Sequence, residues 1–188
     1  MSSVLDDFLD DANRRMDKSV EATVHEFTTV RTGRASTALL DRIEIDYYGQ
    51  KTPLKQLATV NVPESRLITV QPYDPGSMKA IERAIQESDL GLTPSNDGKV
   101  IRLPIPQLTE ERRKELVKVV RHLAEEGRVA IRNVRRDAIH HLKQLVDNGD
   151  VGADEEHRAE ERVQKLTDEH VHRIDDLLKR KEAEIMEV

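Results

Sequence analysis

The 188-residue sequence has no cysteine and no tryptophan, and aromatic residues make up only 3% of it. Without cysteine the chain has no disulfide, no thiolate metal site and no cysteine nucleophile. No segment approaches the run of about 18 apolar residues that a membrane-spanning helix needs. Residues 1–11 carry four aspartates and no apolar run, so we expect no signal peptide. These absences favour a cytoplasmic protein with an aliphatic core.

Charge, by contrast, is abundant and unevenly distributed. Charged residues make up 35% of the chain, which has a net charge of −6. Residues 106–145 hold ten basic and six acidic residues, whereas residues 147–188 hold seven basic and 14 acidic residues. A basic segment in an acidic protein indicates a surface for a polyanion, and RNA is the leading candidate.

Residues 109 to about 146 predict one long helix, in which each residue advances about 100°. The apolar and small residues fall within about 60° of Leu116 and predict a packing face: Val119, Val120, Leu123, Gly127, Ala130, Val134, Ala138 and Leu145. A basic stripe falls at about 100–200°: Lys114, Lys118, Arg121, Arg128, Arg132, Arg135, Arg136 and Lys143. Charged helix faces are often merely solvated. Arginine, however, binds phosphate bidentately, and Glu125 is the only acid within this stripe.

Two further helices are expected, one from about Val4 to Arg31 and one beginning near Asp154. Between Arg34 and Pro104, glycine and proline are frequent and apolar residues alternate. This pattern predicts strands at about 43–49, 57–62, 67–71 and 99–103 and one short helix that begins near Asp74. The predicted fold class is therefore α+β. Residues 1–33 and 107–188 form an elongated three-helix bundle, and residues 34–106 form a small inserted β/α/β domain in an L-shaped molecule. Residues 31–34 and 104–106 are the expected linkers.

The sequence contains no recognisable catalytic or metal-binding constellation. Residues 95–99 lack the upstream glycine and the final hydroxyl of a phosphate-binding loop. His140 and His141 are adjacent and point about 100° apart, and His170 lies in an apolar seam where a packed core histidine is expected. We therefore expect no enzyme activity, no metal and no cofactor.

Several segments together resemble the ribosome recycling factor family. They are VRTGRAS (30–36), LLDRIEIDYYG (39–49), TPLKQLA (52–58), SDLGLTPSNDG (88–98), LTEERRKEL (108–116) and VAIRNVRRDA (129–138). The resemblance implies a three-helix bundle with an inserted β/α/β domain, near the size of a tRNA. It also implies a cytoplasmic, monomeric protein that, with elongation factor G and GTP, dissociates post-termination ribosomes into subunits.

The resemblance further implies specific contacts. The bundle would bind large-subunit rRNA near the intersubunit bridges, through Arg113, Arg128, Arg132, Arg135 and Arg136. The joints between the domains would act as a hinge at Arg31, Gly33, Arg34, Pro104 and Pro106. Helical geometry independently selects all of these arginines except Arg113, which lies at about 60°, off the stripe. Two alternatives stay open: a helical scaffold that uses its charged face for protein contacts, and an RNA-processing hydrolase.

Overall fold

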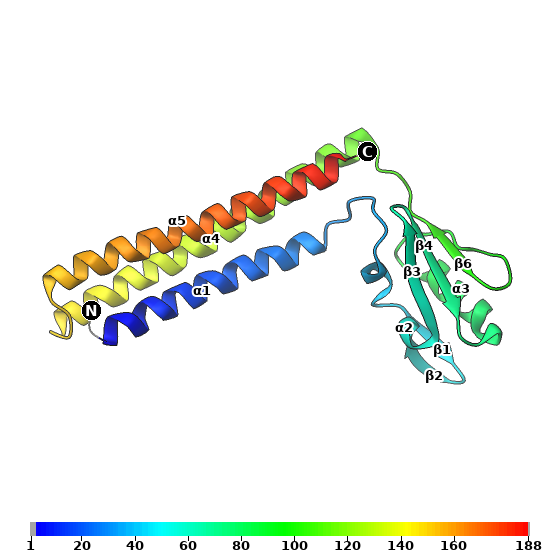
Figure 1. Cartoon of the computed structure of the whole chain (residues 1–188), viewed down its shortest axis with the longest axis horizontal. Coiled ribbons are helices and arrows are strands. Elements are labelled where there is room, and N and C mark those ends of the chain that lie inside the picture. Colours follow the sequence, from blue (N-terminus) through cyan, green and yellow to red (C-terminus); the bar gives the residue numbers. More distant parts are fainter. Residues whose placement is uncertain (1–2, 188) are drawn as a thin grey trace. The chain divides into compact units, whose positions relative to one another are not determined.

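The computed structural model describes residues 3–187. The chain divides into two compact units, one formed by Met1–Arg31 with Glu110–Val188 and the other by Thr32–Thr109. The first unit contains three long helices, α1 (Ser3–Thr28), α4 (Glu110–Asp147) and α5 (Ala153–Met186), which lie side by side (Figure 1). The second unit holds the strands and a shorter helix, which confirms the predicted α+β class.

An aliphatic core holds the three helices together, as the low aromatic content requires. At the end where α1 and α5 begin, Leu5, Phe8 and Leu9 of α1 are buried with Leu142 of α4 and Val163 of α5. Helices this rich in charge are stabilised mainly by packing of such an apolar face rather than by helix propensity. Each helix therefore depends on the other two for its stability.

The buried face of α4 is rotated from the one predicted. Val119 was expected in the packing face but is 44% exposed, whereas Ala124, Ile131 and Leu142 are fully buried. These three residues lie at about 60–80° from Leu116, on one side of the predicted seam, because the positions of the two helices that pack against α4 decide which arc is buried. Val24 of α1, another apolar residue in a helical pattern, is likewise 41% exposed.

The second unit contains two antiparallel sheets. The hairpin β1 (Glu44–Tyr47) and β2 (Gln50–Pro53) forms one, and β3 (Ala58–Glu64), β4 (Leu67–Pro72), β5 (Ser95–Asn96) and β6 (Ile101–Pro104) form the other in the order β3-β4-β6-β5. The short helix η1 (Thr37–Leu40) precedes β1, and α2 (Leu54–Leu57) joins β2 to β3. The helix η2 (Pro75–Ser77) leads from β4 into α3 (Met78–Glu87). Strands β2 and β5 were not predicted, because neither buries a residue that would reveal its pattern.

The two linkers begin close to the strands of the second unit. The Ala35 amide donates to the Ser65 carbonyl at 2.7 Å, and the Ile105 amide donates to the Arg66 carbonyl at 2.8 Å. Pro104 is the last residue of β6. Gly33 has φ +76°, and a Cβ placed on it would lie 3.0 Å from Leu108 Cγ. The boundaries between the two units fall between Arg31 and Thr32 and between Thr109 and Glu110.

The turn before β6 predicts a pH-dependent stability of the second unit. Asp97 accepts hydrogen bonds from the Val100 and Lys99 amides and from Arg102, and these bonds hold its pKa well below the usual range. Because the pKa is lower in the folded chain, the stabilisation is present above about pH 4 and is lost as the pH falls. We expect Asp97→Asn to lower the urea midpoint at pH 7, and the difference from the parent chain to shrink toward pH 3.

Tyrosine fluorescence measures this effect selectively, since all three tyrosines lie in the second unit. The matched control is Asp89→Asn, which removes an exposed carboxylate nearby in the sequence. A difference between parent and Asp97→Asn that stays constant from pH 7 to pH 3 would contradict the prediction.

Candidate nucleic-acid interface

Three arginines of the predicted stripe make hydrogen bonds to side chains of α5. Arg121 Nε lies 2.6 Å from Glu182 Oε1, and Arg128 Nε lies 2.8 Å from Asp175 Oδ1. Arg135 is third in the series, and its Nη1 donates to Gln164 Oε1 at 3.2 Å. Glu182 raises the pKa of Arg121, so this guanidinium keeps its charge. The stripe is therefore partly neutralised by an antiparallel ladder between α4 and α5.

The sequence contained a signal for this ladder. Arg121, Arg128 and Arg135 are seven residues apart, and Asp168, Asp175 and Glu182 of α5 have the same spacing. Charges with a seven-residue repeat beside an apolar seam pair across neighbouring helices, as at the flanking positions of a coiled coil. In the third rung Gln164 stands between the charges, because its amide donates to Asp168 at 2.9 Å while its carbonyl accepts from Arg135. Arg135 is thus held by a neutral group.

Arg113 of α4 lies beside the C-terminal end of α5, whereas the third rung of the ladder lies nearer the beginning of that helix. Its Nη1 is 3.4 Å from the Met186 carbonyl, one of the last carbonyls of that helix, and its Nε is buried. A cation at a helix C-terminus is favourable because the unpaired carbonyls there carry partial negative charge. Arg113 therefore contacts the C-terminal end of α5, which its position off the stripe did not predict.

Three of the remaining basic residues, all in the C-terminal half of α4, form an outer ridge, which we define as Arg132, Arg136 and Lys143. Their spacing of four and seven residues places them on one face of the helix. Arg136 and Lys143 are exposed and have no hydrogen bond or ion pair within residues 3–187. Arg132 contacts Glu125 at 2.9 Å, in a solvent-exposed pair of the kind worth at most about 1 kcal/mol. From residue 128 to residue 146 the only acid is Asp137, which pairs with Arg15 of α1 at 2.9 Å.

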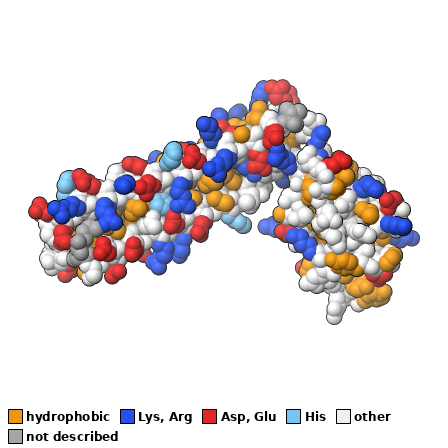
Figure 2. Space-filling model, viewed as in Figure 1, with side chains coloured by type: hydrophobic (Ala, Val, Ile, Leu, Met, Phe, Trp, Pro, Cys, Tyr) orange, Lys and Arg blue, Asp and Glu red, His pale blue; other side chains and the backbone are white. Residues whose placement is uncertain are grey.

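Elsewhere on the bundle the two signs of charge are mixed. Figure 2 shows basic and acidic side chains interspersed over the visible face of the helices. Arg128 is an example of a basic residue that is paired with acids. Burial lowers its pKa, but the hydrogen bonds to Asp175 and Glu125 outweigh the effect of burial and raise the pKa overall. A polyanion is repelled by such a mixed surface except where acids are missing, so the outer ridge is the best candidate interface.

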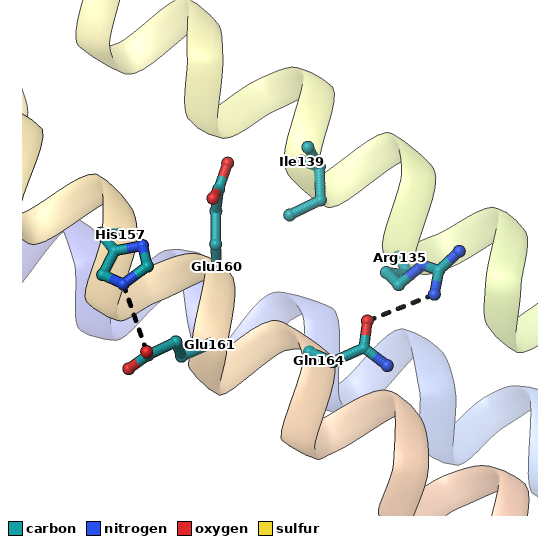
Figure 3. Close-up of a pocket in the computed structure, with 6 residues that line it drawn as sticks. All are labelled: Arg135, Ile139, His157, Glu160, Glu161 and Gln164. Carbon is teal, nitrogen blue, oxygen red and sulfur yellow. Dashed lines mark hydrogen bonds and ion pairs between the residues drawn. The ribbon is translucent and has the colours of Figure 1, made fainter.

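A groove of about 410 Å³ opens beside the third rung of the ladder. Arg135 and Ile139 line it from α4, and His157, Glu160, Glu161 and Gln164 line it from α5. Figure 3 shows Glu160 and Ile139 pointing into the space between the two helices, while His157 pairs with Glu161. Within the described part of the chain, no group of three or more histidine or acidic residues could hold a metal ion.

Comparison with known proteins gives the same family over the whole chain. A family model described as "Ribosome recycling factor" matches residues 23–186. The ribosome-recycling factor of Rubrobacter xylanophilus is 58% identical over 188 residues, which is 100% of both chains. That of Bacillus pumilus is 55% identical over 180 residues, covering 96% of this chain and 97% of the relative.

The chain belongs to the ribosome recycling factor family. A solution structure of a ribosome recycling factor covers 100% of both chains with a TM-score of 0.75 and 46% identity. A second structure, described as models of the T. thermophilus ribosome recycling factor and the E. coli elongation factor G bound to the E. coli post-termination complex, has a TM-score of 0.62 and 48% identity. The latter covers 97% of this chain and 99% of the matched chain. Within residues 3–187, none of the helices has the length and apolar character needed to span a bilayer.

Proposed function

We propose that this chain, as a cytoplasmic monomer, dissociates post-termination ribosomes into subunits together with elongation factor G and GTP. The main support is the solved relative, 48% identical, whose description places a recycling factor and elongation factor G on one post-termination complex. GTP hydrolysis then belongs to the elongation factor, and this chain contributes binding and remodelling without catalysis of its own.

The outer ridge is the proposed contact with large-subunit rRNA near the intersubunit bridges. The observation that carries this assignment is that no acid lies on that face of α4 from residue 128 to residue 146, where Arg136 and Lys143 stand exposed and Arg132 has one weak ion pair. Arg135 can join them, because breaking its hydrogen bond to neutral Gln164 leaves no unpaired carboxylate. We propose that Arg113 and Arg128, which the family resemblance also selects, act through the contact between α4 and α5.

A splitting assay tests the proposed function. Purified post-termination ribosomes are mixed with the chain, elongation factor G and GTP, and subunits are followed by light scattering. We expect dissociation only with all three components. The proposal would be refuted if the ribosomes stayed intact under conditions in which another ribosome recycling factor splits them. Cleavage of RNA without elongation factor G would instead favour a hydrolase, and salt-independent binding would favour a protein scaffold.

We further propose that the joints between the two units form the hinge. Residues Arg31 to Arg34 make one side, and residues 104–106 were expected to make the other. Because Pro104 ends β6 and Ile105 is hydrogen-bonded to Arg66, the proposed second joint begins at Pro106. A proline there restricts the backbone, which limits the directions in which the joint bends.

Gly33→Ala is expected to slow subunit splitting several-fold while leaving ribosome binding intact. The new methyl group meets Leu108, and φ +76° is a conformation that costs a non-glycine residue roughly 1–2 kcal/mol. The matched control is Gly91→Ala, which has φ +66° but no atom within 4 Å of its added Cβ. Equal splitting rates for the two variants would argue against a hinge at Gly33.

A further inference from the structure

The groove between α4 and α5 borders the outer ridge. Ile139 lines this groove, and it lies only about 20–60° around α4 from the three ridge residues. The buried Leu142 lies about 60° from Ile139 in the other direction. The groove therefore opens between the packed interior of the bundle and the ridge, where a molecule bound to the ridge can reach it.

Glu160 of α5 presents a carboxylate to this groove. Its side chain is half-buried and extends toward α4, across from Ile139 (Figure 3). The neighbouring Glu161 lies 3.3 Å from His157, whereas Glu160 makes no hydrogen bond or ion pair within residues 3–187. A carboxylate that has lost part of its water is stabilised by N–H donors, because it can only accept hydrogen bonds. The groove therefore suits a ligand that carries such donors.

The other walls of the groove fit a flat ligand with apolar faces. Ile139 supplies apolar surface, and Arg135 supplies a planar guanidinium that is held at 3.2 Å by the neutral Gln164. The volume of about 410 Å³ falls within the range of about 300–1,000 Å³ that small-molecule sites occupy. Nucleobases that leave the RNA stack are bound in this way, by contacts to their faces and hydrogen bonds to their edges.

We propose that the groove binds an unstacked guanine of the large-subunit rRNA, next to phosphates that lie on the outer ridge. This inference rests on the ribosomal role proposed above. The Watson–Crick edge of guanine carries two neighbouring donors, N1–H and the N2 amino group, which match the two oxygens of the Glu160 carboxylate. Adenine and cytosine offer one donor beside an acceptor nitrogen, and uracil offers one donor between two carbonyls. Glu160 then recognises the base, while the ridge binds the backbone.

A basic protein segment is the other kind of ligand that a carboxylate without a partner attracts. Such a segment would lie against Arg135 and the outer ridge, whose positive charges repel it. The same charges attract RNA phosphates, and no acid other than Asp137 occurs on α4 from residue 128 to residue 146. The surroundings of the groove therefore favour RNA.

The variant Glu160→Gln tests the proposal through the sign of its effect. Removing a negative charge beside a polyanion should tighten binding if Glu160 acts only through its charge. We expect the opposite, namely binding to the large ribosomal subunit that is about tenfold weaker, because the two acceptors for the base are lost. The salt slope should not change, since no phosphate contact is removed.

Glu161→Gln is the matched control, because it removes the same charge one residue away from an exposed side chain. It should bind at least as tightly as the parent chain. Equal affinities of Glu160→Gln and Glu161→Gln would overturn the proposal. The urea midpoints of both variants should equal that of the parent chain, since Glu160 has no partner within residues 3–187 and the Glu161 pair is exposed.

Chemical probing of the bound subunit identifies the base. Kethoxal modifies N1 and N2 of accessible guanines, and dimethyl sulfate reports on adenine and cytosine. At saturating protein we expect one guanine to be protected by the parent chain and by Glu161→Gln but not by Glu160→Gln, while the other protections persist. If no guanine depended on Glu160, the inference would be wrong although the ribosomal role stood. If the parent chain protected no rRNA at all, both would be wrong.

A photo-crosslinking residue at position 161 shows which kind of molecule enters the groove. We expect it to attach to rRNA close to the protected guanine when the chain is bound to purified large subunits. Attachment to a ribosomal protein alone would overturn the proposal, because a protein segment would then occupy the groove.

Discussion

Replacing Arg132 and Arg136 together by alanine is expected to weaken binding to the large ribosomal subunit about 100-fold at low salt. Each guanidinium would lose one charge-assisted contact with a phosphate, worth about 1.5 kcal/mol, and about 1.4 kcal/mol is a factor of ten. The slope of log affinity against log salt should become shallower by about two, since each phosphate contact contributes about one. Filter binding over a salt series measures both quantities.

The control for this variant removes the same charge from α4 at other positions. Lys114→Ala with Arg121→Ala deletes two cations that pair with Glu110 and Glu182, outside the outer ridge. We expect its salt slope to stay close to that of the parent chain. Equal slopes for the ridge variant and the control would show that general charge, and not the outer ridge, determines binding.

Leu142→Ala is expected to lower the free energy of unfolding of the helical unit by about 2–5 kcal/mol. Leu142 is 0% exposed and is buried with Leu5 and Phe8 of α1 and Val163 of α5, so truncation opens a cavity among all three helices. A loss of this size is a large fraction of the stability of an ordinary domain. Urea unfolding followed by circular dichroism measures it.

Val129→Ala provides the comparison, because Val129 lies on the same helix but is 44% exposed. Its effect should stay within about 0.5 kcal/mol. If Leu142→Ala cost no more than Val129→Ala, the bundle would not depend on a packed interior at that end. The tyrosine fluorescence of the second unit should be the same in both variants, since the two units have separate cores.

The sequence predicts the interface as a single stripe, which the structure separates into two groups of arginines. Sequence periodicity selected Arg128, Arg132, Arg135 and Arg136 as one stripe. The structure divides them, because Arg128 and Arg135 lie on the edge toward α5 and Arg136 lies on the outer face. Periodicity within one helix cannot show which edge a neighbouring helix will cover. The matching seven-residue spacing of acids on α5 was the information that would have divided them.

The second unit shows a different limit. The strands with alternating buried residues, such as β4, were predicted close to their observed ends. Strands β2 and β5 have no alternating buried side chains and exist because their backbones pair with β1 and β6. A strand that is held mainly by backbone pairing has no characteristic pattern of side chains, so only the tertiary structure reveals it.

The sequence alone determined the family, the α+β class, the three long helices and the concentration of basic charge in α4, because hydrophobic period and charge placement are local properties of the chain. Only the tertiary structure decided which arginines are paired with α5, which lie on the outer face of α4, and that His170 meets Asp17. Residues 17 and 170 lie far apart in the chain, so their meeting depends on how α1 and α5 pack together. Their contact is a property of that packing.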